Sequence, residues 1–267
     1  MAAWFGAASV NAQTPKTVAP AAGPRASAPA TPSAIEPAAA VAVARMGEYI
    51  KSLPAFSIQA ETSTDEVLVA GPKVQYGGAL NLTYGSPDRL WMRVVRDEED
   101  DQQFFYDGST LSLWIEAKKT WASSPASGTV ADAIAMVEAK YDVSFPLGDL
   151  LSRAVRKDLL KNVEAGILVG SGRVGGVDCD HLGFHQAGAD WQLWIEKGDR
   201  PLPRKLVITT LDEPTQPQHA IVMTWNLSPK LEATRFTFVA PEGAQRIVIA
   251  ERPAASKPAI ATKKEVK

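Results

Sequence analysis

The chain has 267 residues and a formal net charge of −2, a balance that gives no general attraction to nucleic acid. Its single cysteine excludes a framework of disulfide bonds. No stretch of the sequence approaches the ~20 apolar residues that a membrane-spanning helix needs.

The two ends of the chain differ in composition from its middle. Residues 1–12, MAAWFGAASVNA, are apolar and end in small or apolar residues, as at the end of a secretory signal peptide. Residues 13–37 are mostly Ala, Pro, Ser and Thr, and residues 251–267 have the same character with added lysines, so we predict a disordered linker and a disordered basic tail. Residues 38–250 are sufficient for a single domain. We therefore expect an exported, soluble, periplasmic protein.

The first periodic segments predict one helix followed by strands. Residues 37–53 have apolar side chains at helical spacing between two prolines. From Phe56 the apolar period changes to two, with Phe56, Ile58 and Ala60 on one side of a predicted strand at 56–62. Further strands are predicted at 79–85, 88–96, 103–108 and 110–117. The short connections between them indicate antiparallel neighbours.

Two more helices are predicted to interrupt the strands. Thr129 is placed to cap the first, with Asp132 three residues further on. The apolar stripe of this helix is Val130, Ile134, Val137 and Tyr141. The second begins at Pro146, and its apolar face carries Leu147, Leu150, Leu151 and Ala154. Strands then resume at 163–170, 176–186, 190–197, 204–211, 219–227, 234–241 and 244–250.

This order of elements predicts a mainly β (α+β) fold with about 11–12 strands. A sheet of that length curls instead of staying flat and open. The helices need an apolar surface on which to bury their stripes, and the concave side of a curled sheet offers one. We therefore predict a curved antiparallel sheet that forms an incomplete β-barrel, with the helices covering its open face.

The stretch GGVDCDHLGFHQ (175–186) contains the only cysteine and two of the three histidines. A strand here places Cys179 and His181 on one face, but a zinc site needs three or four ligands, so His219 or carboxylates elsewhere would have to complete it. Free cysteine commonly behaves as a small buried hydrophobe. We interpret the stretch as a strand and retain a metal-dependent hydrolase, centred on these three residues, as the least favoured hypothesis.

Two other motifs also have structural explanations. GSGRVG (170–175) matches the dinucleotide-binding glycine pattern, but a strand follows where the pattern needs a helix, so we predict a hairpin turn. RDEEDD (96–101) lacks the spacing and glycine of a calcium loop and predicts a solvated turn. The sequence has no Gly-x-Ser-x-Gly element, and we assign no catalytic residue, metal or cofactor.

Several predicted strands carry bulky apolar residues on both faces, as in LWM (90–92), FFY (104–106) and QLWI (192–195). One explanation is that one face packs the helices and the other packs a neighbouring subunit or stays partly exposed. The other is an apolar hollow between the sheet and its helical cover. Periodicity does not separate a filled core from a cavity, so both explanations stay open.

Two segments resemble the LolA/LolB lipoprotein-localisation superfamily. FFYDGSTLSLWI (104–115) resembles its strand pair with an Asp-Gly hairpin, and YGSPDRLWMRV (84–94) is similar to its basic strand opening, with Ser86 in place of the first basic residue. The region from 46 to 209 resembles more closely a family of uncharacterised predicted periplasmic proteins related to those carriers. CDHLGF (179–184), DWQLWI (190–195) and LPRKLVI (202–208) are its most distinctive pieces.

The resemblance implies an incomplete barrel with an apolar interior that binds acyl chains or lipid-modified proteins, and it brings no catalytic residues. Our leading hypothesis is a non-enzymatic periplasmic carrier for a lipid, a lipoprotein acyl chain or another hydrophobic ligand. The alternative is an envelope sensor or scaffold module that binds a protein partner. The candidate cavity residues are Phe56, Ile58, Leu82, Met92, Phe104, Leu113, Ile134, Val137, Leu150, Leu151, Leu182, Phe184, Trp194, Trp225 and Phe236.

Overall fold

The computed structural model describes residues 35–68, 71–97, 101–141, 147–148, 150, 152 and 157–249. The signal-peptide-like segment, almost all of the predicted linker, and the predicted basic tail lie outside the described residues. So does most of the helix predicted from Pro146, including Leu151; within that segment Leu147, Gly148, Leu150 and Ser152 are helical.

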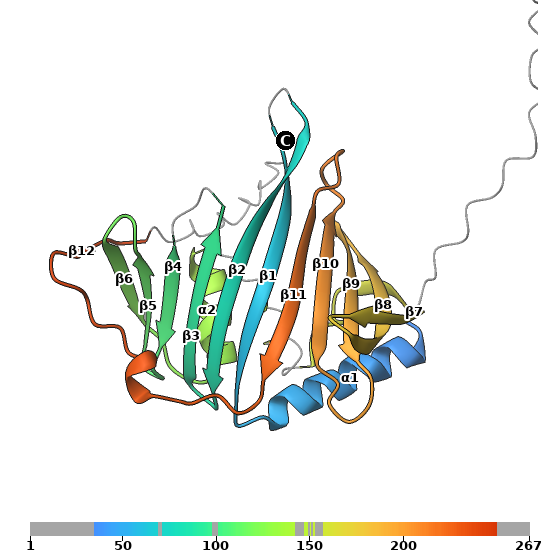
Figure 1. The fold of residues 1–267 in the computed structure, drawn as a ribbon, viewed down its shortest axis with the longest axis horizontal. Helices are drawn as coiled ribbons and strands as arrows, with labels where there is room; N and C mark the ends of the chain where they lie inside the picture. The colour runs from blue at the N-terminus through green and yellow to red at the C-terminus, as the bar shows by residue number, and fades with distance from the viewer. Residues whose placement is uncertain are drawn as a thin grey trace, which may run out of the picture. The chain divides into compact units, whose positions relative to one another are not determined.

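The described chain forms one curved sheet of twelve strands, with the spatial order β12-β6-β5-β4-β3-β2-β1-β11-β10-β9-β8-β7 (Figure 1). The strands are β1 (Ala55–Val67), β2 (Lys73–Gly85), β3 (Arg89–Arg96), β4 (Gln102–Tyr106), β5 (Thr110–Ile115), β6 (Thr120–Pro125), β7 (Val163–Val174), β8 (Val177–Gln186), β9 (Ala189–Glu196), β10 (Pro203–Thr210), β11 (Gln218–Asn226) and β12 (Gln245–Arg246). β7 and β12 end the order, so the sheet does not close. The prediction of a mainly β fold with an incomplete barrel is confirmed.

The strand pairing explains how two consecutive runs of strands become one sheet. β1 to β6 follow one another as antiparallel neighbours, and β7 to β11 do the same. The runs join where β11 pairs antiparallel with β1, with Trp225 opposite Ile58. The one departure from the predicted antiparallel order is β12, which runs parallel to β6.

The register aligns apolar residues in rows across the sheet, because directly opposed residues point to the same face. One row consists of Trp225, Ile58, Leu82, Met92, Phe104, Leu113 and Ala122. Another consists of Leu182, Leu193, Leu206 and Ile221. We call the face that carries these rows the inner face and the opposite one the outer face.

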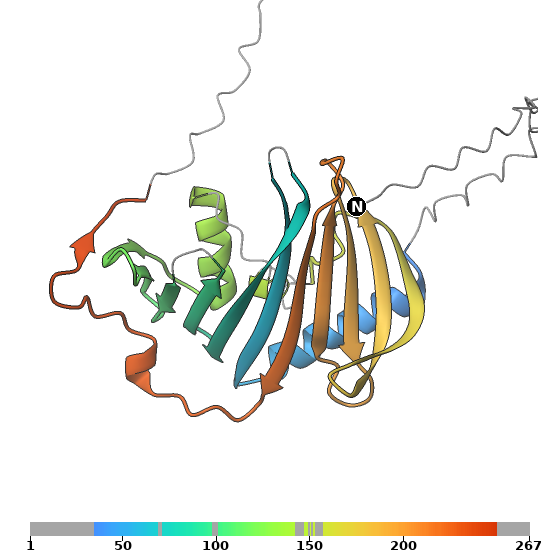
Figure 2. The same cartoon turned by 45° about the horizontal axis from the view of Figure 1, so that its top comes forward.

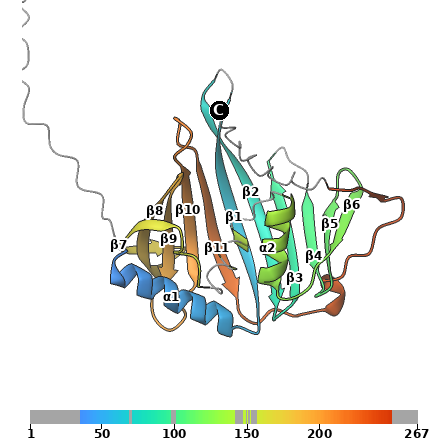
Figure 3. The same cartoon turned by 180° about the vertical axis from the view of Figure 1, so that it is seen from behind.

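Two helices bury their apolar stripes in the core on the inner face. α1 (Pro37–Ser52) buries Ala39, Val43, Met46, Gly47 and Ile50. α2 (Val130–Tyr141) buries Val130, Ala133 and Val137. Seen from behind, α2 stands in front of β2 and β3, whereas α1 runs along the ends of the strands of the other half (Figure 3). The first two of the three predicted helices are confirmed.

The C-terminal part of the domain differs from the prediction. Residues 234–241, predicted as a strand, contain the end of a short 3-10 helix (Ala233–Arg235) followed by irregular chain that passes around the edge of the sheet (Figure 2). Its alternating apolar residues do not reflect strand pairing: the ring of Phe238 packs on outer-face rings of Phe105, Trp114 and Trp121. Of the last predicted strand, 244–250, only the two residues of β12 are a strand. The sequence analysis did not predict β6, which is rich in small and polar residues.

Candidate functional site

The start of α2 is fixed to the inner face by polar contacts. The Thr129 hydroxyl donates to Asp132 (2.7 Å) and accepts from the Asp132 backbone N–H (3.3 Å), which confirms the predicted cap. The fully buried Tyr106 hydroxyl donates to the carbonyl oxygen of Gly128 at 2.8 Å, and burial raises the pKa of Tyr106. The backbone N–H of Val130 donates to the Pro87 carbonyl (3.0 Å). These bonds hold the helix across β2 to β5.

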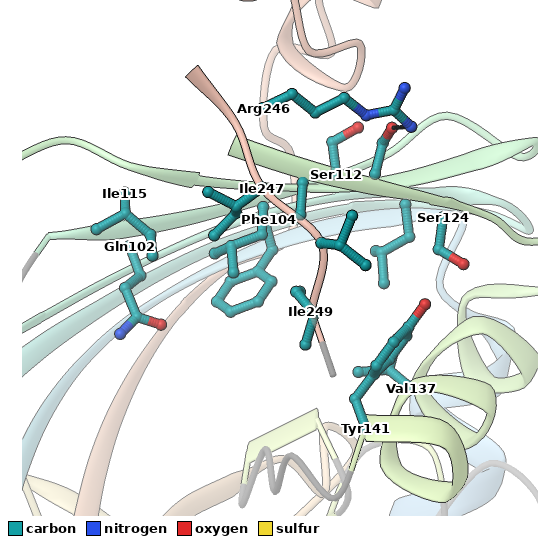
Figure 4. A pocket seen from close by; sticks show the side chains of 15 residues that line it. Gln102, Phe104, Ser112, Ile115, Ser124, Val137, Tyr141, Arg246, Ile247 and Ile249 are labelled. Carbon is teal, nitrogen blue, oxygen red and sulfur yellow. Dashed lines mark hydrogen bonds between the residues drawn. The ribbon is translucent and has the colours of Figure 1, made fainter. Parts of the chain in front are cut away.

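A hollow of about 470 Å³ lies between α2, the inner face of β4 to β6 and the last residues of the described chain (Figure 4). Inner-face Phe104, Leu111 and Leu113 form much of its floor, and Val137 and Tyr141 of α2 form one side. Of the described residues that line it, Arg246 is the only charged one. Ile247, Val248 and Ile249 complete its rim. This hollow is therefore predominantly apolar.

A larger hollow of about 810 Å³ lies at the other side of α2. Its apolar wall comes from α1, the inner face and α2, through Ile50, Phe56, Leu82, Leu90, Val130 and Ile134. Lys51 and Lys157 stand in its polar part. The Lys157 ammonium lies 2.5 Å from the Glu48 carboxylate, and its hydrogen bond and positive charge lower the pKa of Glu48. The larger hollow thus combines an aliphatic wall with charged groups.

A narrow gap of about 20 Å³ lies beneath α2 and shares wall residues with both hollows. It shares Phe104, Leu111 and Val137 with the smaller hollow. It shares Leu82, Leu90, Ile134 and Gly148 with the larger one. The three spaces therefore follow one another across the sheet under a single helix.

The structure brings about half of the sequence-predicted cavity residues together around these spaces. Those that line a hollow or the gap are Phe56, Leu82, Met92, Phe104, Leu113, Ile134 and Val137. Those that belong to the packed core or lie against it, outside these walls, are Ile58, Leu150, Leu182, Phe184 and Trp225. Phe236 is buried in the irregular segment after β11, and Leu151 lies outside the described residues.

Trp194 was predicted to line the cavity, but the strand register places it on the other face of the sheet. It lies opposite His181 on the outer face, where the two rings stack with centroids 4.1 Å apart and planes at 9°. The Lys205 ammonium sits over the same indole, 4.9 Å from its centroid. Trp194 is therefore an outer-face residue and not part of the inner wall.

The sequence prediction missed several wall residues that the register places beside predicted ones. Leu111 lies two residues before Leu113 on the same face, and Ala122 lies directly opposite Leu113. Period-two spacing could have found Leu111. Ile247 and Ile249 had no such signal, because their part in the site depends on where the end of the domain crosses β6.

The cysteine–histidine stretch is a strand, as interpreted, and its side chains have structural partners. Cys179 is fully buried on the outer face, and burial raises the pKa of its thiol. His181 bonds the Gln192 side chain (2.9 Å). His219 lies on the inner face of β11, three strands away, with Nδ1 2.7 Å from the Thr64 hydroxyl. The residues of the least favoured hypothesis are thus not brought together.

The glycine motif is a turn, whereas residues 98–100 of the acidic run lie outside the described residues. Gly175 and Gly176, both with positive φ (54° and 80°), make the hairpin between β7 and β8, so the glycine pattern is not followed by a helix. Asp101, at the end of the acidic run, accepts from the Arg93 guanidinium. Within the described ranges, no group of three or more His, Cys, Asp and Glu side chains is placed to hold a metal ion.

None of the helices in the described part of the chain has the length and apolar character needed to cross a bilayer. A comparison with curated protein sequences gives no match. Among solved structures, the fold is similar to lipoprotein LppX of Mycobacterium tuberculosis, with 12% identity, 74% of this chain and 100% of that chain covered, and a TM-score of 0.46. It is also similar to LprF of Mycobacterium bovis, with 10% identity, 80% and 100% coverage and a TM-score of 0.43.

A LolA superfamily protein from Nitrosomonas europaea is similar as well, with 10% identity, 75% of this chain and 97% of that chain covered, and a TM-score of 0.33. The model of one sequence family, described as predicted periplasmic protein (DUF2092), matches residues 39–250, which is most of the chain and every strand of the sheet. The resemblance noted in the sequence is therefore confirmed, and the chain belongs to the DUF2092 family of predicted periplasmic proteins.

Proposed function

We propose that this protein is a periplasmic carrier that holds an acyl chain or another hydrophobic ligand beside α2, between the helix and the inner face. The observation that carries the proposal is the pair of hollows of about 470 and 810 Å³ on either side of that helix. Each has the size of a small-molecule site, which is typically about 300–1,000 Å³ and mostly apolar. Their walls contain six of the residues that the sequence pattern nominated, and the gap between them adds Met92.

The energetics favour such a ligand. Burial of one methylene group contributes ~0.8 kcal/mol, so a chain that buries ten of them gains ~8 kcal/mol before the cost of ordering it. A carrier must compete with a membrane, which offers the same gain per methylene. An aliphatic and aromatic wall therefore provides comparable affinity without a dedicated charged anchor.

The proposal is tested first by native mass spectrometry of protein purified from the periplasm of its native host. We expect co-purified lipid that dissociates on activation. Protein that is consistently empty, and that binds no fluorescent fatty-acid probe after delipidation, would contradict the proposal.

A pair of matched variants sharpens this test. Ala122→Trp places an indole in the smaller hollow, because Ala122 is a buried inner-face residue of its wall. Ala79→Trp makes the same change at an exposed outer-face position of β2. We expect Ala122→Trp to weaken probe binding by about tenfold, the effect of losing roughly two buried methylenes, and Ala79→Trp to leave it unchanged.

A second candidate, a module that binds a protein partner through the sheet edge, is supported by β7. Within the described ranges, the open side of this strand carries one bridge, between Ile35 and Gly166, and the Leu168 N–H donates to the Glu36 carboxylate (2.9 Å). Leu168 and Val169 on the same strand are exposed. An edge of this kind accepts an added strand. Periplasmic cross-linking from Val169 that captures a partner, in protein without bound lipid, would favour this function over the carrier.

A further inference from the structure

The end of the domain forms a strap across the edge of the sheet, which we define as residues 236–249. Phe238 packs on the outer-face ring of Trp121, and the Arg246 guanidinium lies 5.2 Å from the centroid of the same ring. Two backbone bonds attach the strap to β6, from Gln245 N–H to the Lys119 carbonyl (2.9 Å) and from Ile247 N–H to the Trp121 carbonyl (2.7 Å). The strap is thus fixed as far as residue 247.

Beyond this attachment the strap presents aliphatic side chains at the rim of the smaller hollow. Ile247, Val248 and Ile249 are consecutive residues in the wall of the hollow whose floor contains Phe104. Figure 4 shows Ile247 and Ile249 on the side of this hollow where the chain leaves β12. Val248 is 94% exposed and Ile247 36% exposed. Packing of the domain core does not explain why either of these side chains is exposed. Large apolar side chains exposed at the mouth of an apolar hollow are typical of a surface that contacts a membrane or a partner.

Positive charge predominates at this rim and in the sequence that follows it. Among the described residues that line the smaller hollow there is one charged side chain, Arg246, and no Asp or Glu. The sequence that follows the strap, residues 251–267, contains five basic and two acidic residues, although the whole chain has a net charge of −2. Anionic headgroups attract such a segment, and each basic residue near the surface strengthens binding about fivefold.

We propose that the rim of the smaller hollow docks onto a lipid bilayer that carries anionic headgroups. Ile247 and Val248 insert at the interface, and the net positive charge of the sequence that follows adds to the attraction of the anionic headgroups. The rim offers a few aliphatic groups with diffuse positive charge, which matches a bilayer better than the aromatic core and paired hydrogen bonds of a protein interface. The inference rests on the proposed function, because docking lets a hydrophobic ligand pass between membrane and hollow without crossing water.

The test is co-sedimentation of the full chain with vesicles. We expect binding to vesicles of phosphatidylethanolamine and phosphatidylglycerol, weakening as salt rises, and little binding to pure phosphatidylcholine. Val248→Asp, and separately the triple change of Lys257, Lys263 and Lys264 to Gln, should each reduce partitioning by about tenfold or more. The matched control is Val239→Asp, an 80% exposed strap residue that is not in the wall of the hollow, and it should bind as the wild type does.

Equal binding to both kinds of vesicle, binding to neither, or equal loss in Val248→Asp and Val239→Asp would overturn the inference. Binding of a fluorescent fatty-acid probe is measured on the same preparations. A wild type that binds the probe but not the anionic vesicles contradicts only the docking surface. A wild type that binds the vesicles but not the probe contradicts the carrier function and leaves the docking surface standing.

Discussion

The two halves of the sheet carry similar rows of apolar residues, but the space above them is filled differently. On the inner face of β8 to β11, Leu182, Leu193, Leu206 and Ile221 are at most 3% exposed, and none lines either hollow. On the inner face of β2 to β5, the row from Leu82 to Leu113 borders the two hollows and the gap between them.

The helices explain this difference. α1, which runs along the filled half, buries long side chains, including Met46 at 0% exposure and Ile50 (Figure 3). α2 buries two valines and an alanine. α1 also buries Ala39, Val43 and Gly47, and Ile134 and Met136 of α2 pack against the core, so side-chain size alone does not distinguish the two helices. The position of each helix over the sheet, more than the strand pattern, therefore decides where the hollows lie.

The largest predicted effect tests the filled half. Leu193→Ala should lower the free energy of unfolding by about 2–5 kcal/mol, because it leaves a cavity in a packed core. Leu113→Ala removes the same atoms from a half-buried residue that already borders a hollow, and should cost less than half as much. Urea unfolding measures both. Equal costs would show that the hollow half is packed as tightly as the other.

The cap of α2 should matter next. Thr129→Ala removes the hydroxyl that bonds Asp132 and should cost about 1 kcal/mol of stability in the same urea assay. We also expect weaker binding of a fatty-acid probe, since the helix walls both hollows. Thr129→Ser retains the hydroxyl and serves as the control. Unchanged probe affinity in Thr129→Ala would mean that the hollows do not depend on this attachment.

The sequence could predict the fold but only part of the site. Period-two spacing identified Leu82, Phe104 and Leu113 as residues of one face, and pairing then aligned them in one row. It could not separate Leu82, which borders a hollow, from Ile58 beside it in that row, which is in the filled core. That distinction depends on where the helices cross the sheet.

Period-two spacing was also misleading at the end of the domain. Residues 234–241 alternate as a strand does, yet they lie over outer-face aromatic rings and make no ladder. β6 has the opposite property, because its inner-face positions include Ala122 and Ser124, which give no hydrophobic signal. Small residues in the wall of a hollow are thus among those that pattern analysis overlooks.

The pH dependence of stability should reveal the second attachment of α2. Tyr106→Phe should cost about 0.5–1.5 kcal/mol, because it removes the hydrogen bond from the buried tyrosine to the Gly128 carbonyl. Burial raises the pKa of Tyr106, so its contribution is present below the ordinary tyrosine pKa of about 10 and is lost as pH rises through the raised value. Urea midpoints between about pH 8 and pH 11 should fall more steeply for the wild type than for Tyr106→Phe. If the two proteins gave parallel curves of urea midpoint against pH, the Tyr106 hydroxyl would be exposed to water and its pKa would not be raised by folding.

The smallest effect concerns the ion pair beside the larger hollow. Glu48 and Lys157 are both largely exposed, so Glu48→Gln should barely change the urea midpoint at neutral pH. The bond from Lys157 lowers the pKa of Glu48, so the small contribution exists above the ordinary glutamate pKa and disappears as pH falls through the lowered value.

The same ion pair connects α1 to Lys157, a wall residue of the larger hollow. Loss of the pair should therefore affect ligand binding in that hollow. We expect faster dissociation of a fatty-acid probe from Glu48→Gln, with an unchanged urea midpoint, in stopped-flow measurements at low salt. Glu61→Gln, at an exposed position of β1 outside both walls, is the control. If high salt accelerates dissociation from the wild type but not from Glu48→Gln, the ion pair restrains the hollow half. If salt changes the dissociation rate equally in the wild type and in Glu48→Gln, the packing of α1 alone restrains the hollow half. The contrast between the two halves of the sheet then lies entirely in their apolar side chains.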